Sequence, residues 1–243
     1  MSDAYTFQAR RVPVAAVAVP PIVLLGAGIV TTTGLGVASG LVLTVMAAIA
    51  GQLGRDRGKM LEPALWASWG GSPTLQRLRF RGGSNVGRVE RLHARIEQVL
   101  GEPLPTATEE DADPAGADDR YEEASARVRA LTRDRKCFPL LFAENVNYGQ
   151  RRNLLGLRPA GVGVAVMTVV AAGVLLWLAD GSLSQRAARY GPGAGVGLLT
   201  LVFWLVVVRA SWVRLTANAY ADQFVGAIDK LHDERAASQP AQQ

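Results

Sequence analysis

The chain has 243 residues, of which 49% are hydrophobic and only 19% are charged. An ordinary soluble domain carries charge on about a quarter of its residues, and the charge here is also unevenly spread. Residues 12–53 contain no Asp, Glu, Lys, Arg or His, whereas residues 54–159 are rich in charges of both signs. This division excludes a single soluble domain and a mainly disordered chain, and it predicts a membrane protein that carries a polar domain.

Cysteine and histidine are too scarce for several kinds of chemistry. The single cysteine, Cys137, excludes an intramolecular disulfide framework, and two histidines, His93 and His232, make a His/Cys metal site a poor interpretation. No nucleophile with a base, acid–base pair or cofactor motif is visible, so we expect no cofactor and no enzymatic activity. The net charge is +5, and the basic residues gather at the ends of apolar segments. We therefore expect contacts with anionic lipid headgroups and no nucleic-acid partner.

Four apolar segments are long enough to cross a membrane. The uncharged run 12–53 would be ~63 Å long as one helix, about twice a hydrocarbon core, so it must fold back. The polar, Gly-rich patch 31–36 predicts the turn, which gives spans at 12–30 and 35–53. Two later apolar runs, 160–179 and 190–208, predict the third and fourth spans, with a short loop from Asp180 to Arg189 between them.

The distribution of basic residues predicts the orientation of these spans. Arg55, Arg57 and Lys59 follow the second span, and Arg151, Arg152 and Arg158 precede the third. Because cytoplasmic flanks carry an excess of Lys and Arg, we expect both termini and residues 54–159 in the cytoplasm. The predicted location is the inner membrane of a bacterium, which the chain crosses several times.

Small residues recur at helical spacing in the predicted spans. Gly36 and Gly40 lie four residues apart in the second span, as do Gly193 and Gly197 in the fourth. Such residues let helices approach closely in lipid, where no hydrophobic effect drives helices together. The pattern predicts helix packing, either within one four-helix bundle or between copies of the chain, and the sequence leaves both alternatives open.

The predicted organisation is all-α, with two transmembrane hairpins and a helical cytoplasmic domain inserted between them. Its segments are 1–53, 54–159, 160–208 and the amphipathic C-terminal helix and tail 209–243. Within the polar domain we expect a short helix over Met60–Trp69 and helix starts at Ser72-Pro73, Asn85 and Asp113-Pro114. The acidic link from Glu102 to Asp113 is expected to be solvated, and His93 to lie on a helix surface.

Two polar groups are candidate ligand sites. Arg77, Arg79 and Arg81 precede Gly82-Gly83 and predict either an anion-binding turn or simply solvated arginines, since the P-loop pattern is not met. The second group consists of Glu144, Asn145, Tyr148, Arg151 and Arg152. It predicts either a ligand or partner surface beneath the membrane or a juxtamembrane anchor that holds anionic lipid.

Two stretches of the polar domain resemble a group of uncharacterised bacterial multi-pass membrane proteins. They are Leu65-Trp66-Ala67-Ser68-Trp69-Gly70-Gly71-Ser72-Pro73-Thr74 and the later Phe138-Pro139-Leu140-Leu141-Phe142 with Glu144-Asn145 and Arg151-Arg152-Asn153-Leu154. The resemblance implies a membrane location and carries no activity. We expect a non-enzymatic, membrane-anchored interaction or effector protein with a homo-oligomeric or protein partner. The alternative is a channel or transporter formed by the four-helix membrane region, either in one copy of the chain or in an oligomer.

Overall fold

The computed structural model describes residues 17–19, 21–23, 33–82 and 85–238, with only the backbone described for residues 33–48. Over these residues the chain is helical and contains no strand, which confirms the all-α prediction. It divides into two compact units. We call Met1–Glu62 with Gly149–Val213 the apolar unit, and Pro63–Tyr148 with Arg214–Gln243 the polar unit.

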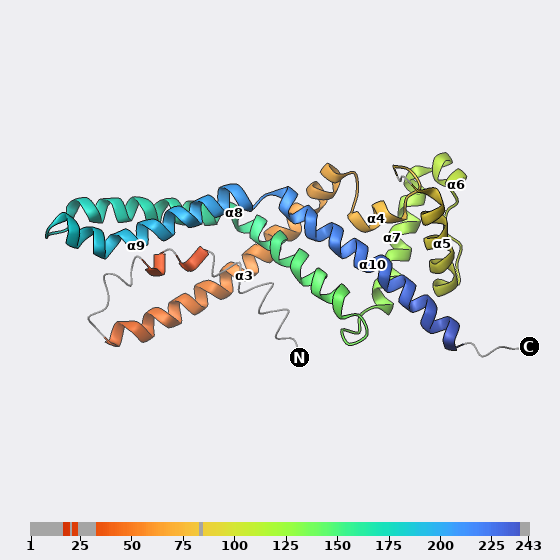
Figure 1. Ribbon diagram of the computed structural model, residues 1–243, viewed down its shortest axis with the longest axis horizontal. Helices are drawn as coiled ribbons and strands as arrows, with labels where there is room; N and C mark the ends of the chain where they lie inside the picture. The colour runs from red at the N-terminus through yellow and green to blue at the C-terminus, as the bar shows by residue number, and fades with distance from the viewer. Residues whose placement is uncertain (1–16, 20, 24–32, 83–84, 239–243) are drawn as a thin grey trace, which may run out of the picture. The chain divides into compact units, whose positions relative to one another are not determined.

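The helices can be followed in chain order in Figure 1. They are α3 (Thr33–Trp69), α4 (Pro73–Leu78), α5 (Val86–Leu100), α6 (Ala107–Ala112), α7 (Pro114–Leu131), α8 (Pro139–Leu178), α9 (Leu183–Val202), the π-helix η2 (Phe203–Val207) and α10 (Ala210–Ser238). The expected separate helix Met60–Trp69 is wrong, because these residues are the last turns of α3. Its predicted end is right, since Gly70 and Gly71 follow with positive φ values that stop the helix.

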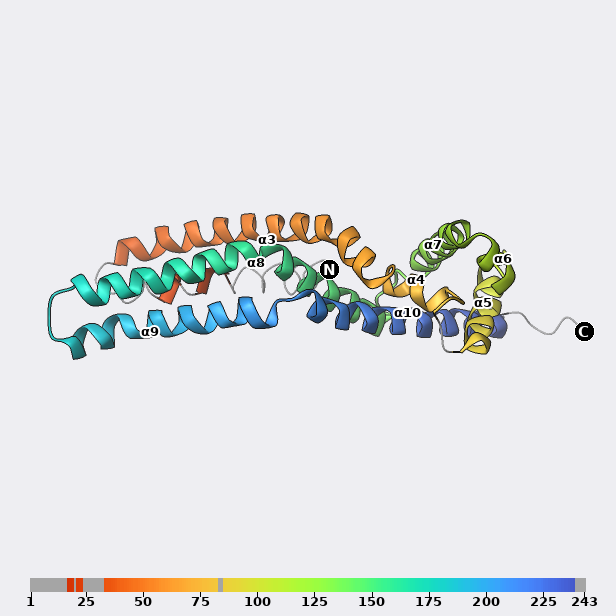
Figure 2. The same cartoon turned by 90° about the horizontal axis from the view of Figure 1, so that it is seen from above.

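Two helices of the apolar unit are long and apolar enough to cross a membrane. They are α8, with a mean hydropathy of 2.3 in its most apolar window, and the segment Leu183–Val207, with 1.7. Figures 1 and 2 show α8 and α9 side by side, running in opposite directions. Only 22% of each apolar window is buried, and Met167, Trp177 and Leu199 are more than 70% exposed. The pair therefore presents a broad apolar surface that the described part of the chain leaves exposed.

These two helices contain the third and fourth predicted spans. Residues 160–178 of the third predicted span fall in α8, and residues 190–207 of the fourth fall in α9 and η2. The first predicted span, 12–30, lies mostly outside the described residues. The second, 35–53, lies on α3, but Gly36 and Gly40 belong to the part whose side chains lie outside the description.

The predicted loop from Asp180 to Arg189 is wrong, because α9 already begins at Leu183. Ser182 caps the helix: its hydroxyl accepts from the Gln185 N–H at 3.3 Å, and Gln185 Oε1 accepts from the Ser182 N–H at 3.0 Å. Arg186 reaches back and donates to the carbonyls of Leu176 and Trp177 at 2.9 and 3.1 Å. These carbonyls end α8 and lack intrahelical donors, so the arginine closes the turn.

Glycines of α9 face α8 within the same chain. A Cβ on Gly197 would lie 2.9 Å from Val169 Cγ2, and Gly193 is buried. By contrast, a Cβ on Gly191 or Gly195 would meet nothing within 4 Å. Gly197 therefore serves the packing of the α8–α9 pair itself, while the choice between one four-helix bundle and an interface between copies stays a prediction.

One close helix approach in the apolar unit joins α3 and α8. A Cβ on Gly156 would lie 2.6 Å from the backbone nitrogen of Gly58 and 2.9 Å from the carbonyl oxygen of Gly54. The two backbones therefore touch, and only glycine fits between them. Near this contact Arg152 Nη1 pairs with Glu62 Oε1 at 2.9 Å, with both side chains largely buried. Sequence reasoning missed this Gly-xxx-Gly pair because charged residues surround it.

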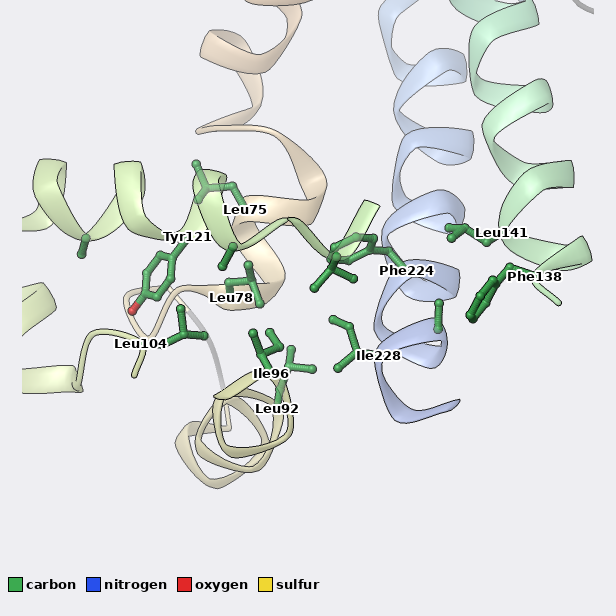
Figure 3. Packing of buried hydrophobic residues seen from close by; sticks show 14 residues of the cluster. Leu75, Leu78, Leu92, Ile96, Leu104, Tyr121, Phe138, Leu141, Phe224 and Ile228 are labelled. Carbon is green, nitrogen blue, oxygen red and sulfur yellow. The ribbon is translucent and has the colours of Figure 1, made fainter. Parts of the chain in front are cut away.

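The polar unit is built around its own hydrophobic core (Figure 3). Leu78 from α4, Tyr121 from α7 and Phe224 with Ile228 from α10 are completely buried there, and Ile96 from α5 is 1% exposed. The amphipathic C-terminal helix thus supplies part of this core, as its apolar stripe predicts. Burial of these large side chains away from water is the main force that holds these helices together.

Local capping sets the helix starts of the polar unit. Ser72 and Asp113 accept backbone N–H groups and each is followed by proline, and Asn85 caps α5 in the same way, as predicted. The link from Glu102 to Asp113 differs from the expectation, because it contains α6. A reciprocal pair of hydrogen bonds between Thr106 and Glu109 starts that helix.

Candidate functional site

A buried carboxylate organises one side of the polar unit. Glu110 on α6 is 1% exposed and accepts from the backbone N–H groups of Phe80 and Arg81 at 2.8 and 3.0 Å. The Tyr121 hydroxyl donates to it at 2.9 Å, and Arg81 Nη1 lies 3.2 Å away. Glu110 therefore differs from the solvated acid that the sequence predicts: it ties α6 and α7 to the turn after α4.

Two carboxyl groups of this cluster have pKa values below their ordinary range. Burial alone would raise the pKa of Glu110, but the N–H groups of Arg81 and Phe80 and the Tyr121 hydroxyl outweigh it and lower that pKa. For Asp118 burial again acts to raise the pKa, while Arg79 and Arg81 lower it further than burial raises it. Both groups are therefore held as carboxylates that neutralise the neighbouring guanidinium groups.

The three predicted arginines are engaged by these acids. Arg79 forms a two-pronged pair with Asp118, at 2.7 Å from Nε to Oδ1, and Arg81 pairs with both Glu110 and Asp118. Arg77 pairs with Asp222 at 2.9 Å. They line an open pocket of about 660 Å³. Because the guanidinium donors already pair with carboxylates, an anion would have to compete with these acids, and anion binding stays a prediction.

His93 is buried, against the expectation of a surface position. It is 5% exposed, its Nε2 lies 2.7 Å from the Leu78 carbonyl oxygen, and the rings of Phe80 and Tyr121 lie beside it. Burial lowers its pKa, which the contact with Leu78 only partly offsets. We interpret His93 as a structural link between α5 and the end of α4.

A second pocket brings together predicted and unpredicted residues. We call it the α7 pocket; it has a volume of about 400 Å³, within the range of small-ligand sites. Two of the predicted polar residues, Asn145 and Tyr148, line it. The rest of its lining comes from the ends of α3 and α4 and from α7 and α10: Trp66, Ser72, Pro73, Thr74, Leu75, Glu122, Ser125, Ala126, Arg129, Ala217 and Tyr220.

Two residues of the α7 pocket carry buried polar atoms without a hydrogen-bond partner in the described part of the chain. They are Trp66, through its Nε1, and Ser125, through its Oγ; the Ser125 residue as a whole is 4% exposed. A buried polar atom without a partner costs about 1–3 kcal/mol, and a group that bonds to it would remove that cost. The α7 pocket is therefore lined by two residues whose polar atoms form no hydrogen bond within the described part of the chain.

The other members of the predicted membrane-side surface lie elsewhere. Glu144 contacts Asn147 at 3.4 Å. Arg151 belongs to the apolar unit, donates to the Trp212 carbonyl at 3.0 Å and stacks over the Trp212 ring. Arg152 pairs with Glu62, so both arginines have protein partners besides any headgroup.

Sequence reasoning missed Ser125 and Tyr220 as pocket residues. Ser125 follows Ala124 in the apolar stripe of α7, and a small polar residue there is the only local signal. Tyr220 is indistinguishable from a core residue of α10, and burial raises the pKa of its hydroxyl.

Comparison with protein-family models, curated proteins and solved structures finds no match to this chain.

Proposed function

We propose that this chain is a non-enzymatic, membrane-anchored docking or sensing protein, in which the α8–α9 pair holds the polar unit at a membrane and the α7 pocket receives a ligand or partner. In this proposal residues 12–30 and 35–53 form two further spans, which gives four. Both termini and the polar unit lie on the cytoplasmic side of a bacterial inner membrane.

The observation that carries the proposal is the α7 pocket. Five helices of the polar unit meet around it, and it combines aromatic walls with two unused polar atoms. The exposed apolar surface of α8 and α9 supports the anchor, since the core helix of a soluble protein would be mostly buried. No group of three or more His, Cys, Asp or Glu side chains suited to a metal occurs in the described ranges.

The test of this function uses the full chain purified from its own membranes. Native mass spectrometry is expected to find a bound molecule on the wild type and on Ala130→Trp, and to lose it in Ala126→Trp. Ala126 lines the pocket, whereas Ala130 is an exposed alanine one turn along the same helix that does not line it. In proteoliposomes the protein should conduct no K⁺, Cl⁻ or glycerol above the protein-free level. Selective flux would instead support a channel or transporter.

A further inference from the structure

The walls of the α7 pocket favour a flat ligand. Trp66 at the end of α3, Tyr148 on α8 and Tyr220 on α10 contribute three aromatic rings to a lining that is more apolar than polar. Aromatic side chains bind planar groups through offset or edge-to-face contacts, which a branched aliphatic group cannot make. The volume of about 400 Å³ limits the occupant to one or two rings with a short substituent.

The charges at the α7 pocket favour a ligand without net charge. Glu122 and Arg129 lie seven residues apart on α7, two turns along one face and ~10 Å from each other. Both side chains are exposed, and no other charged residue among those described lines the pocket. Their opposite charges cancel, so neither an anion nor a cation gains a net electrostatic advantage on entering.

The unused polar atoms define the substituent. The indole Nε1 of Trp66 is a donor only, and the Ser125 hydroxyl can also donate. Both atoms are covered and lack a partner in the described part of the chain, so a ligand reaches them only when the two side chains turn toward the pocket. A ligand gains most by offering an acceptor to these donors, because it then removes a desolvation cost that the free protein already carries. A carbonyl oxygen or a ring nitrogen supplies such an acceptor.

From these features we infer that the α7 pocket binds a small, planar, uncharged molecule that carries a hydrogen-bond acceptor, such as an aromatic amide. This inference rests on the proposed docking function and names the ligand class for its site. The Trp66 Nε1, which can only donate, selects the acceptor, the Ser125 hydroxyl adds a second hydrogen bond, and the rings of Tyr148 and Tyr220 hold the planar part.

The experiment compares three probes that differ in one substituent on a benzene ring. Benzamide offers an uncharged acceptor, benzoate an anion, and benzylammonium a cation that only donates. Each is titrated against the detergent-solubilised full chain, and binding is followed by saturation-transfer difference NMR. Benzamide is expected to bind at least about threefold more tightly than benzylammonium, which has no acceptor and so loses one modest hydrogen bond. Benzoate also accepts hydrogen bonds, but it is expected to bind more weakly than benzamide because its charge loses water without gaining a net opposite charge in the pocket.

Matched variants locate the binding. Ala126→Trp should abolish benzamide binding by filling the pocket, while Ala130→Trp should leave it unchanged. Ser125→Ala should weaken benzamide about threefold to tenfold, because it removes one hydrogen-bonding partner of the amide. Melting temperatures of the variants are measured beside the titrations, and Ser125→Ala keeps the test decisive if the tryptophan variant does not fold.

Several results would overturn the inference. Tighter binding of benzoate or benzylammonium would assign the pocket another ligand class, and benzamide binding that Ala126→Trp does not change would place it elsewhere. The docking function is tested separately from the ligand class. It is contradicted only if the molecule that co-purifies from native membranes is still bound in Ala126→Trp.

Discussion

Replacing Gly156 with leucine is expected to break the contact between α3 and α8 and to cost about 3 kcal/mol of stability or more. The first side-chain atom would already lie 2.6 Å from the Gly58 nitrogen and 2.9 Å from the Gly54 oxygen. Both are backbone atoms that cannot turn aside as a side chain can, so the helices must separate. The measurement is the thermal midpoint of the full chain in detergent.

Gly163→Leu is the matched control for this prediction. It lies on the same helix, seven residues further on, and a Cβ there would meet nothing within 4 Å. Its midpoint should stay close to that of the wild type. Equal midpoints for the two leucine variants would show that α3 and α8 do not touch at Gly156.

Glu110→Gln is expected to destabilise the polar unit by about 3 kcal/mol, the scale for breaking one partner of a buried, hydrogen-bonded ion pair. Glutamine keeps the shape but removes the charge that faces Arg81. Its side-chain amide has one oxygen and one NH2 group, so it cannot replace the two carboxylate oxygens that accept from the Phe80 and Arg81 N–H groups. Chemical denaturation followed by circular dichroism measures the loss. Asp111→Asn is the control, since Asp111 is exposed on the same short helix.

The same carboxylate predicts a dependence of stability on pH. The folded-state pKa of Glu110 lies below its ordinary value, as does that of Asp118. Their contribution is therefore fully present above the pKa of the unfolded carboxyl groups and is lost as the pH falls through the lower, folded-state values. In Glu110→Gln this loss of stability on acidification should be smaller, and an unchanged acid profile would contradict the role assigned to Glu110.

Features encoded within one turn of helix could be predicted from the sequence. Ser72, Asn85 and Asp113 were recognised as helix starts because a cap depends on residues no more than three positions away. The two described candidate spans were recognised because twenty apolar residues in a row are unmistakable. The helix start at Ser182 was missed, although its hydroxyl and Gln185 form an equally local signature.

Features that depend on distant partners could not be predicted in this way. Glu110 and His93 look solvated in the sequence, and their burial follows only from where Arg81 and Leu78 lie in the fold. The α7 pocket shows the same limit. Asn145 and Tyr148 stood out as polar residues in an apolar stretch. Ser125 and Tyr220 line the pocket only because five helices meet there, which the sequence does not show.

The central claim is that α8 and α9 cross a membrane, so that the turn between them and the polar unit lie on opposite sides. The native Cys137 is exposed in the polar unit, and Ser184 is exposed near the start of α9. A membrane-impermeant maleimide applied to intact cells should label Ser184→Cys in a Cys137→Ser background, and should label the wild-type Cys137 only after the cells are permeabilised. Equal accessibility of the two cysteines in intact cells would contradict the account.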